Sequence, residues 1–145
     1  MRIDFYQLRT RPLEAVLPAI CEKVLAGGGR LMIVGDVELL AVLDRQLWTF
    51  APASFLPHGR ADQPRAADQP VLLSQDCAAV NGARNVALVD GRWRDEALGF
   101  DRVFYFFDAG SPGEARTAWR ALRGRDGAEL HFWKQNEAGR WEEGP

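Results

Sequence analysis

The sequence predicts an α/β domain with a mostly parallel central sheet and helices on both faces. Two observations support this expectation. Short apolar runs typical of buried strands alternate along the chain with stretches in which apolar residues recur every three or four positions, as on one face of a helix. This alternation favours a parallel sheet covered by helices on both sides. With 145 residues, 47% of them hydrophobic, the chain suits one three-layer domain over residues 1–145.

A first strand and a first helix are expected before residue 30. Residues 3–8 alternate in polarity and are rich in β-formers, which favours a strand. Residues 13–25 place apolar side chains on one helical face, and the glycines at 27–29 are expected to end that helix. Pro18 lies inside this pattern and is expected to kink the helix or to move its start.

A second strand and helix follow, and then a long loop. Residues 31–34 form a fully apolar run, typical of a strand buried on both faces, and Asp36 is expected to cap a helix that runs through Leu47. Four prolines then interrupt the pattern, and the polar residues 59–68 predict an exposed loop. A loop of this length inside a compact domain is often functional.

The second half of the chain predicts three strands. Residues 71–73 and 85–89 have the composition of strands. Residues 103–107 form either a buried strand or the start of an aromatic helix, and we favour the strand.

A last helix, a last strand and a tail complete the expected order. The helix should start around residues 111–114, continue to Arg125 and end at Gly127. Residues 129–134 predict the closing strand, and the tail over 136–145 is expected to fray except where Trp141 docks.

Charge and cysteine content exclude several classes of protein. The formal net charge is −2 and the pI is near 5.7, so binding of nucleic acid through bulk positive charge is disfavoured, and DNA contact is expected only indirectly. Cys21 and Cys77 cannot form a disulfide framework for a chain of this length. The N-terminus carries an acid where a signal peptide would be apolar, and no window is long enough to span a bilayer. We therefore expect a cytoplasmic protein.

The motifs for cofactor or metal chemistry are missing. The glycines at 27–29 precede a strand, whereas a phosphate-binding loop follows a strand and opens a helix, so a Rossmann-like fold without a nucleotide-binding loop is expected. His58 and His131 lack the spaced partners that a metal site needs. We expect no cofactor, no metal and no catalytic residue.

Two groups of residues stand out as candidate binding surfaces. Trp48, Phe50 and Phe55 lie at a helix end and in the proline-rich stretch beyond it, where they serve either as core residues or as anchors for a partner protein. The second group lies on the last predicted helix and consists of Arg116, Trp119, Arg120 and Arg123, which share one helical face.

A guanidinium row beside an indole suits an acidic peptide that ends in an aromatic residue. The alternative is a solvated arginine face with Trp119 in the core, which the residues alone favour. Single-stranded DNA could also stack on this indole, but the net charge of −2 opposes high affinity.

Several stretches taken together are similar to a known family. The most specific is Leu43-Asp44-Arg45-Gln46-Leu47-Trp48-Thr49-Phe50 followed by Ser54-Phe55-Leu56-Pro57-His58-Gly59. Further matching stretches are residues 5–8, the helix around Cys21, residues 29–33 with Asp36, and residues 69–73, 115–120 and 127–133. In this order they resemble the chi subunit of bacterial DNA polymerase III, a clamp-loader accessory protein.

The resemblance implies a protein without catalytic activity that bridges the clamp loader to single-stranded-DNA-binding protein. Trp48 and Phe55 match the aromatic residues that meet the psi subunit or a helicase. Arg116, Trp119 and Arg120 match the residues that receive the acidic C-terminal tail of single-stranded-DNA-binding protein, and both groups then become functional candidates.

The sequence departs from the family pattern at three points of this helix. Trp119 stands where a tyrosine can stand, and Arg120 replaces a possible lysine. Pro112 falls near a position where another basic side chain can assist, so we expect either a weaker electrostatic contribution to tail binding or that Arg123 takes over that role.

Two other functions stay open at this stage. The first is a chi-like adaptor for a DNA-repair helicase in place of the clamp loader. The second is a small nucleotide-binding α/β enzyme that uses a cleft at the carboxyl ends of the strands, with His58 or Asp36 nearby.

Overall fold

The computed structural model describes residues 1–49 and 58–144, except for the side chains of Trp48 and Thr49. The strands are β1 (Arg2–Leu8), β2 (Leu31–Val34), β3 (His58–Arg60), β4 (Val71–Ser74), β5 (Asn85–Leu88), β6 (Arg102–Asp108), β7 (Glu129–Gln135) and β8 (Trp141–Glu143). The helices are α1 (Leu13–Ala26), α2 (Val37–Thr49) and α3 (Gly113–Leu122), with two 3-10 turns, η1 (Ala66–Asp68) and η2 (Asp95–Gly99).

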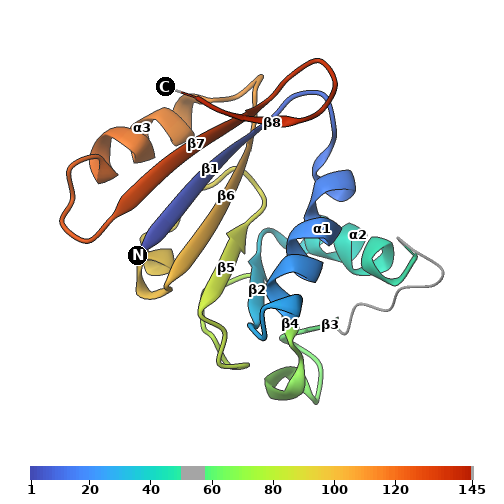
Figure 1. Cartoon of the computed structure of the whole chain (residues 1–145). Helices are drawn as coiled ribbons and strands as arrows, with labels where there is room; N and C mark the ends of the chain where they lie inside the picture. Colours follow the sequence, from blue (N-terminus) through green and yellow to red (C-terminus); the bar gives the residue numbers. More distant parts are fainter. Residues whose placement is uncertain (50–57, 145) are drawn as a thin grey trace.

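The strands form one sheet in the order β3-β4-β2-β5-β6-β1-β7-β8 (Figure 1). All neighbouring pairs among the described strands are parallel except β7 and β8, which are antiparallel. The predicted α/β fold with a mostly parallel sheet is therefore confirmed, and residues 103–107 lie in a strand, β6, as favoured.

Each face of the sheet has its own apolar core, because successive side chains of a strand point to opposite sides. In β1, Tyr6 belongs to the core under α1 and α2, whereas Phe5 belongs to the core under α3 and η2. Figure 1 shows α3 on the opposite side of the long strands from α1 and α2. This three-layer arrangement matches the sequence-based expectation.

The first helix follows its predicted pattern closely. Leu17 and Cys21 are fully buried on its inner face, and burial raises the pKa of the Cys21 thiol to about 12, so this thiol is a core group. The helix begins at Leu13, so Pro18 lies within it and does not set its start. Gly28 ends the helix in the left-handed conformation, with φ of 80°, which confirms the glycines as a C-terminal cap.

The N-terminal cap of α2 is also as predicted. The Oδ1 atom of Asp36 accepts a hydrogen bond of 2.8 Å from the backbone N–H of Leu39. This bond satisfies one of the N–H groups that lack a partner within the helix.

Three boundary predictions are wrong. Helix α3 ends at Leu122 and not at Arg125, because Gly124 adopts a φ of 84° that turns the chain out of the helix. The expected loop over 59–68 begins inside β3 and contains η1. The tail is not frayed over its described part, because β8 pairs with β7 and Trp141 packs edge-on against Tyr6 at 5.0 Å.

None of the helices in the described ranges is long and apolar enough to cross a bilayer.

Candidate peptide-binding site

Helix α3 is held against the sheet by small and apolar side chains on its inner face. Ala115, Ala118 and Leu122 are buried there, at the spacing of three and four that places side chains on one helical face. Alanines at two of these positions let the helix lie close to the strands beneath it. The polar side chains of α3 are consequently left on its flanks and outer face.

A groove of about 380 Å³ runs along one flank of α3, and we call it the tail groove. Its floor consists of Phe107 at the end of β6, Phe132 from β7 and Gln7 from β1. The lining on the helix side includes all four residues that the sequence predicted for peptide binding, namely Arg116, Trp119, Arg120 and Arg123. The structure therefore brings this predicted group together along one groove.

The indole of Trp119 belongs partly to the core and partly to the groove. It is half-buried and packs edge-on against Phe5 at 5.1 Å and against Phe132 at 6.0 Å. These edge-to-face contacts hold the ring in place. The two alternatives drawn from the sequence, a core residue or an exposed platform, are thus both partly right for Trp119.

The three arginines of the tail groove are exposed and have no side-chain partner. Among the described residues, Arg116, Arg120 and Arg123 donate no side-chain hydrogen bond and form no ion pair. Most of the available charge on this flank is therefore positive and uncompensated. A ligand that brings carboxylates can use the planar donor forks of these guanidinium groups.

Sequence reasoning did not identify the floor of the tail groove. Phe107 and Phe132 lie in runs that were assigned to strands and to the core, and Gln7 closes the first strand. Their alternation along strands was visible, but the side of the sheet that each faces depends on the strand order, which the sequence left open.

The predicted group of aromatic residues, Trp48, Phe50 and Phe55, lies outside the described residues as far as its side chains are concerned. Trp48 belongs to the last turn of α2, and its side chain is not described. Phe55 falls in residues 50–57, which the structure does not describe.

The two residues suggested for an enzyme site lie at opposite ends of the sheet. Asp36 follows β2 and lines a cleft of about 970 Å³ at the carboxyl ends of the strands. His58 starts β3, opposite Val71 at the start of β4, so it lies at the amino ends. Its imidazole is buried, with Nε2 3.1 Å from the Asp44 carboxylate.

The charges around that cleft oppose a phosphate-bearing ligand. Its lining includes three arginines and five carboxylates, namely Arg9, Arg11, Arg92, Glu14, Asp36, Asp90, Asp108 and Glu114. Repulsion by the excess of carboxylates disfavours a polyphosphate. Among the described residues, no group of three His, Cys, Asp or Glu side chains is placed to hold a metal ion.

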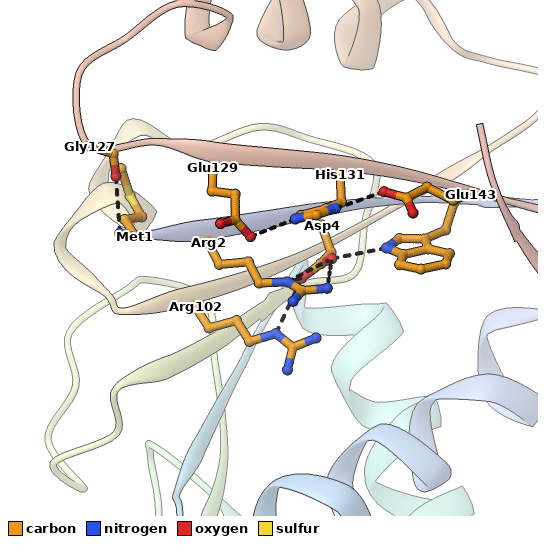
Figure 2. Close-up of polar contacts among 9 residues, drawn as sticks. Met1, Arg2, Asp4, Arg102, Gly127, Glu129, His131 and Glu143 are labelled. Carbon is orange, nitrogen blue, oxygen red and sulfur yellow. Dashed lines mark hydrogen bonds and ion pairs between the residues drawn. The ribbon is translucent and has the colours of Figure 1, made fainter. Parts of the chain in front are cut away.

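A second polar cluster lies on the sheet face opposite α3 (Figure 2). Its centre is the fully buried carboxylate of Asp4 in β1. This carboxylate accepts hydrogen bonds from Arg2 Nε at 3.1 Å, Arg102 Nε at 3.2 Å and Trp133 Nε1 at 2.9 Å. The cluster joins three neighbouring strands, β6, β1 and β7, and no pattern in the sequence predicted it.

An imidazole clamp borders this cluster on β7. His131 bonds Glu129 at 2.6 Å through Nε2 and Glu143 of β8 at 2.8 Å through Nδ1. These bonds to Glu143 and Glu129 raise the pKa of His131, because both carboxylates favour the charged imidazolium. The clamp therefore ties β8 to β7.

Comparison with known proteins points to one family. A family model described as DNA polymerase III chi subunit, HolC, matches residues 1–130. A protein of Rickettsia prowazekii (strain Madrid E), named probable DNA polymerase III subunit chi, is 26% identical over 77 residues. This alignment covers 53% of the chain and 47% of the Rickettsia protein, so it spans about half of that relative's length. Helix α3 lies inside the range of the family match, and β8 lies beyond it.

Proposed function

Because the chain belongs to the family of DNA polymerase III chi subunits, we propose that it is a non-catalytic accessory subunit of the clamp-loader complex. In this role it bridges the replisome to single-stranded-DNA-binding protein by holding the acidic C-terminal tail of that protein in the tail groove. The protein acts in the cytoplasm and contacts DNA only indirectly.

The observation that carries this proposal is the row of unpartnered arginines above an apolar floor. Within the described residues, Arg116, Arg120 and Arg123 have no carboxylate to bind, although the chain has more acidic than basic residues. An acidic peptide supplies the missing carboxylates. Its terminal aromatic ring fits the floor, where Trp119 and Phe132 meet edge-on.

The size of the groove supports a short ligand. Its volume of about 380 Å³ lies near the lower end of the roughly 300–1,000 Å³ that is usual for ligand pockets. The groove therefore accommodates the last residues of a tail and not a folded domain. In this proposal, preceding acidic residues extend along α3 towards Arg123, whose guanidinium group takes over from the basic side chain that is missing near Pro112.

The test is a titration of the full-length protein with a fluorescent peptide that carries an acidic stretch and a C-terminal Pro-Phe. We expect micromolar binding that weakens with salt and that Arg116→Ala abolishes or strongly reduces. The matched control is Arg84→Ala, which removes an exposed arginine that is already paired with Asp101 at 3.4 Å.

The control variant should bind like the wild-type protein, and both variants should keep the wild-type unfolding curve. Absence of binding by the wild-type protein, or equal binding by Arg116→Ala, would show that this arginine row is only solvated surface.

The same proposal assigns the clamp-loader contact to Trp48 and Phe55, with the psi subunit as partner. A DNA-repair helicase is the alternative partner for this surface. Purification of the tagged protein from its own cell extract, beside a Trp48→Ala/Phe55→Ala variant, tests the assignment. If clamp-loader subunits are recovered with the wild-type protein but not with the variant, the assignment is supported. If a helicase is recovered and no clamp-loader subunit, the alternative is favoured.

A nucleotide-binding enzyme is disfavoured by the acidic lining of the cleft at the carboxyl ends of the strands. Saturating nucleotide that leaves the melting temperature unchanged would agree with this, because a ligand that binds only the folded state raises that temperature.

A further inference from the structure

A second groove runs along the other flank of α3. It has a volume of about 710 Å³ and lies between the helix and the segment that precedes β6. Trp93 and Leu98 form one wall, and Ala121 and Leu122 belong to the helix side. We call it the Trp93 groove.

The two grooves are separated by the part of α3 that packs on the sheet. Arg116 and Arg120 line the tail groove, whereas Thr117 and Ala121 line the Trp93 groove. At 100° per residue, the second pair lies about 100° further around the helix than the first. A ligand in one groove consequently leaves the other one open.

The walls of both grooves rest on the same buried ring. Trp93 stacks on Phe5 with an interplanar angle of 6° and a centroid distance of 6.3 Å, and it also contacts Tyr105 at 5.4 Å. Trp119 packs edge-on against Phe5 from the tail groove. Each groove therefore has an indole wall that the core holds in place, which keeps the cost of ordering it on binding low.

The carboxylates of the Trp93 groove accept hydrogen bonds from Trp93, whereas its arginines have no side-chain partner among the described residues. Asp95 accepts a hydrogen bond of 2.8 Å from the indole N–H of Trp93, and Glu114 accepts one from the backbone N–H of the same residue. In the part of the chain that the structure describes, the side chains of Arg92 and Arg125 bond to nothing. The two carboxylates of the lining balance the two arginines in formal charge, so the preference of this groove for carboxylates rests on the two guanidinium groups without a partner.

These two arginines border opposite ends of the groove. Arg92 adjoins the contact between Trp93 and Glu114 at the first turn of α3, and Arg125 follows the last turn. Ten helical residues span about 15 Å at 1.5 Å each. An extended peptide covers that length with about five residues at 3.3 Å each.

From this arrangement we infer that the Trp93 groove is a second peptide-binding site, which takes an internal acidic segment of a partner protein. The segment carries apolar side chains that pack on Trp93 and Leu98, flanked by two carboxylates about five residues apart that pair with Arg92 and Arg125. Because the carboxylates belong to side chains, the site needs no free C-terminus. It is distinct from the proposed tail site and does not depend on it.

The test uses the indole N–H resonances of Trp93 and Trp119 in a nitrogen-labelled, full-length protein. These resonances are assigned with the variants Trp93→Phe and Trp119→Phe. The probe is the peptide Asp-Ser-Leu-Leu-Ser-Asp, acetylated and amidated at its ends so that it offers no terminal carboxylate. A second probe replaces both aspartates with asparagine.

We expect the acidic peptide to shift the Trp93 resonance saturably and to leave the Trp119 resonance in place. Arg125→Ala should weaken its binding by about three- to fivefold, the size expected for an exposed ion pair, whereas Arg123→Ala should leave it unchanged. Arg125 is exposed, so this variant should retain the wild-type fold.

Three results would overturn the inference: no shift of the Trp93 resonance, a shift of the Trp119 resonance alone, or equal binding of the asparagine peptide. The acidic tail peptide with a C-terminal Pro-Phe serves as a separate measurement. It should move the Trp119 resonance whether or not the Trp93 groove binds, so the two proposals succeed or fail independently.

Discussion

Two groups of arginines lie on opposite faces of the sheet and differ in what they contact. Arg2 and Arg102 converge on the buried carboxylate of Asp4 (Figure 2), whereas Arg116 and Arg120 line the tail groove without any side-chain partner among the described residues. Arginine thus neutralises a buried charge in one region, whereas in the other its guanidinium groups are free to bind an external ligand. The number of arginines in the chain does not separate these roles, but their partners in the folded protein do.

The largest effect is expected where the charge is buried. Asp4→Asn keeps the shape of the side chain but leaves two guanidinium groups without their shared counter-charge. Breaking a buried pair costs about 3–5 kcal/mol, and we expect the lower end because Arg2 and Arg102 are 41% and 36% exposed. The free energy of unfolding, measured in urea, should fall by about 3 kcal/mol.

The control for this variant is Asp101→Asn, which removes the carboxylate from an exposed pair with Arg84. It should change the free energy of unfolding by less than about 0.5 kcal/mol. Binding of the tail peptide should stay the same in both variants. A loss below about 1 kcal/mol for Asp4→Asn would mean that the buried cluster is no more stabilising than a surface pair.

In the tail groove we expect a large loss of peptide binding and almost no change in stability. Arg116→Ala combined with Arg120→Ala should weaken binding of the tail peptide by about a hundredfold, because each charge-assisted contact contributes about tenfold. The free energy of unfolding should change by less than about 0.5 kcal/mol, since both side chains are exposed and unpartnered.

The matched control is Arg65→Ala combined with Arg84→Ala, which removes the same charge from two exposed ion pairs. If this control weakened tail binding as strongly, the effect would come from net charge and not from the groove.

The sequence predicted the elements of the fold better than it predicted contacts between them. Periodicity is a local signal, so residues 31–34 and the cap at Asp36 were found at their correct positions. Two of the three partners of Asp4 lie 98 and 129 positions away in the chain, and they meet it only because β1 lies between β6 and β7. Such a strand order is not encoded in any local pattern.

The tail groove and the β7–β8 hairpin show the same limit. The arginine face of α3 was predictable because it is a helical repeat within eight residues. The floor under it was not, because Phe107 and Phe132 come from separate strands. The hairpin of β7 and β8 was missed because β8 has only three residues, two of them glutamates, which is too short for an alternating pattern.

A change in salt concentration should affect the two arginine groups differently, and this difference is smaller than the effects of the substitutions above. Charges at an exposed groove are screened over about 8 Å at physiological ionic strength, whereas Asp4 is fully buried. Raising the salt concentration from about 50 mM to about 500 mM should weaken tail binding by about fivefold. The stability difference between the wild-type protein and Asp4→Asn should stay nearly constant over the same range. Tail binding that is insensitive to salt would show that the apolar floor, and not the arginines, dominates affinity.

The smallest effect concerns pH and the clamp around His131. The pKa of His131 is raised above its ordinary value of 6.5, so the stability that the imidazolium contributes is fully present below 6.5 and is lost as the pH rises through the folded value. The pKa of Glu129 is lowered from 4.5, so its contribution is lost as the pH falls through that lowered value. The contacts of His131 with Glu129 and Glu143 are therefore most stabilising between the lowered pKa of Glu129 and the raised pKa of His131.

The readout is hydrogen exchange at the amide of Gly144, which donates to the carbonyl of Phe132 at 2.7 Å and so reports on the closure of β8 against β7. Its protection, corrected for the intrinsic pH dependence of exchange, should fall by about twofold when the pH rises through the folded pKa of His131, because exposed pairs contribute little. His131→Gln cannot become charged, so its protection should not change over this range.

The tail groove has no titrating group in its lining at these pH values, and tail binding should stay constant. Protection that varies equally in both proteins would place the pH sensitivity outside the clamp.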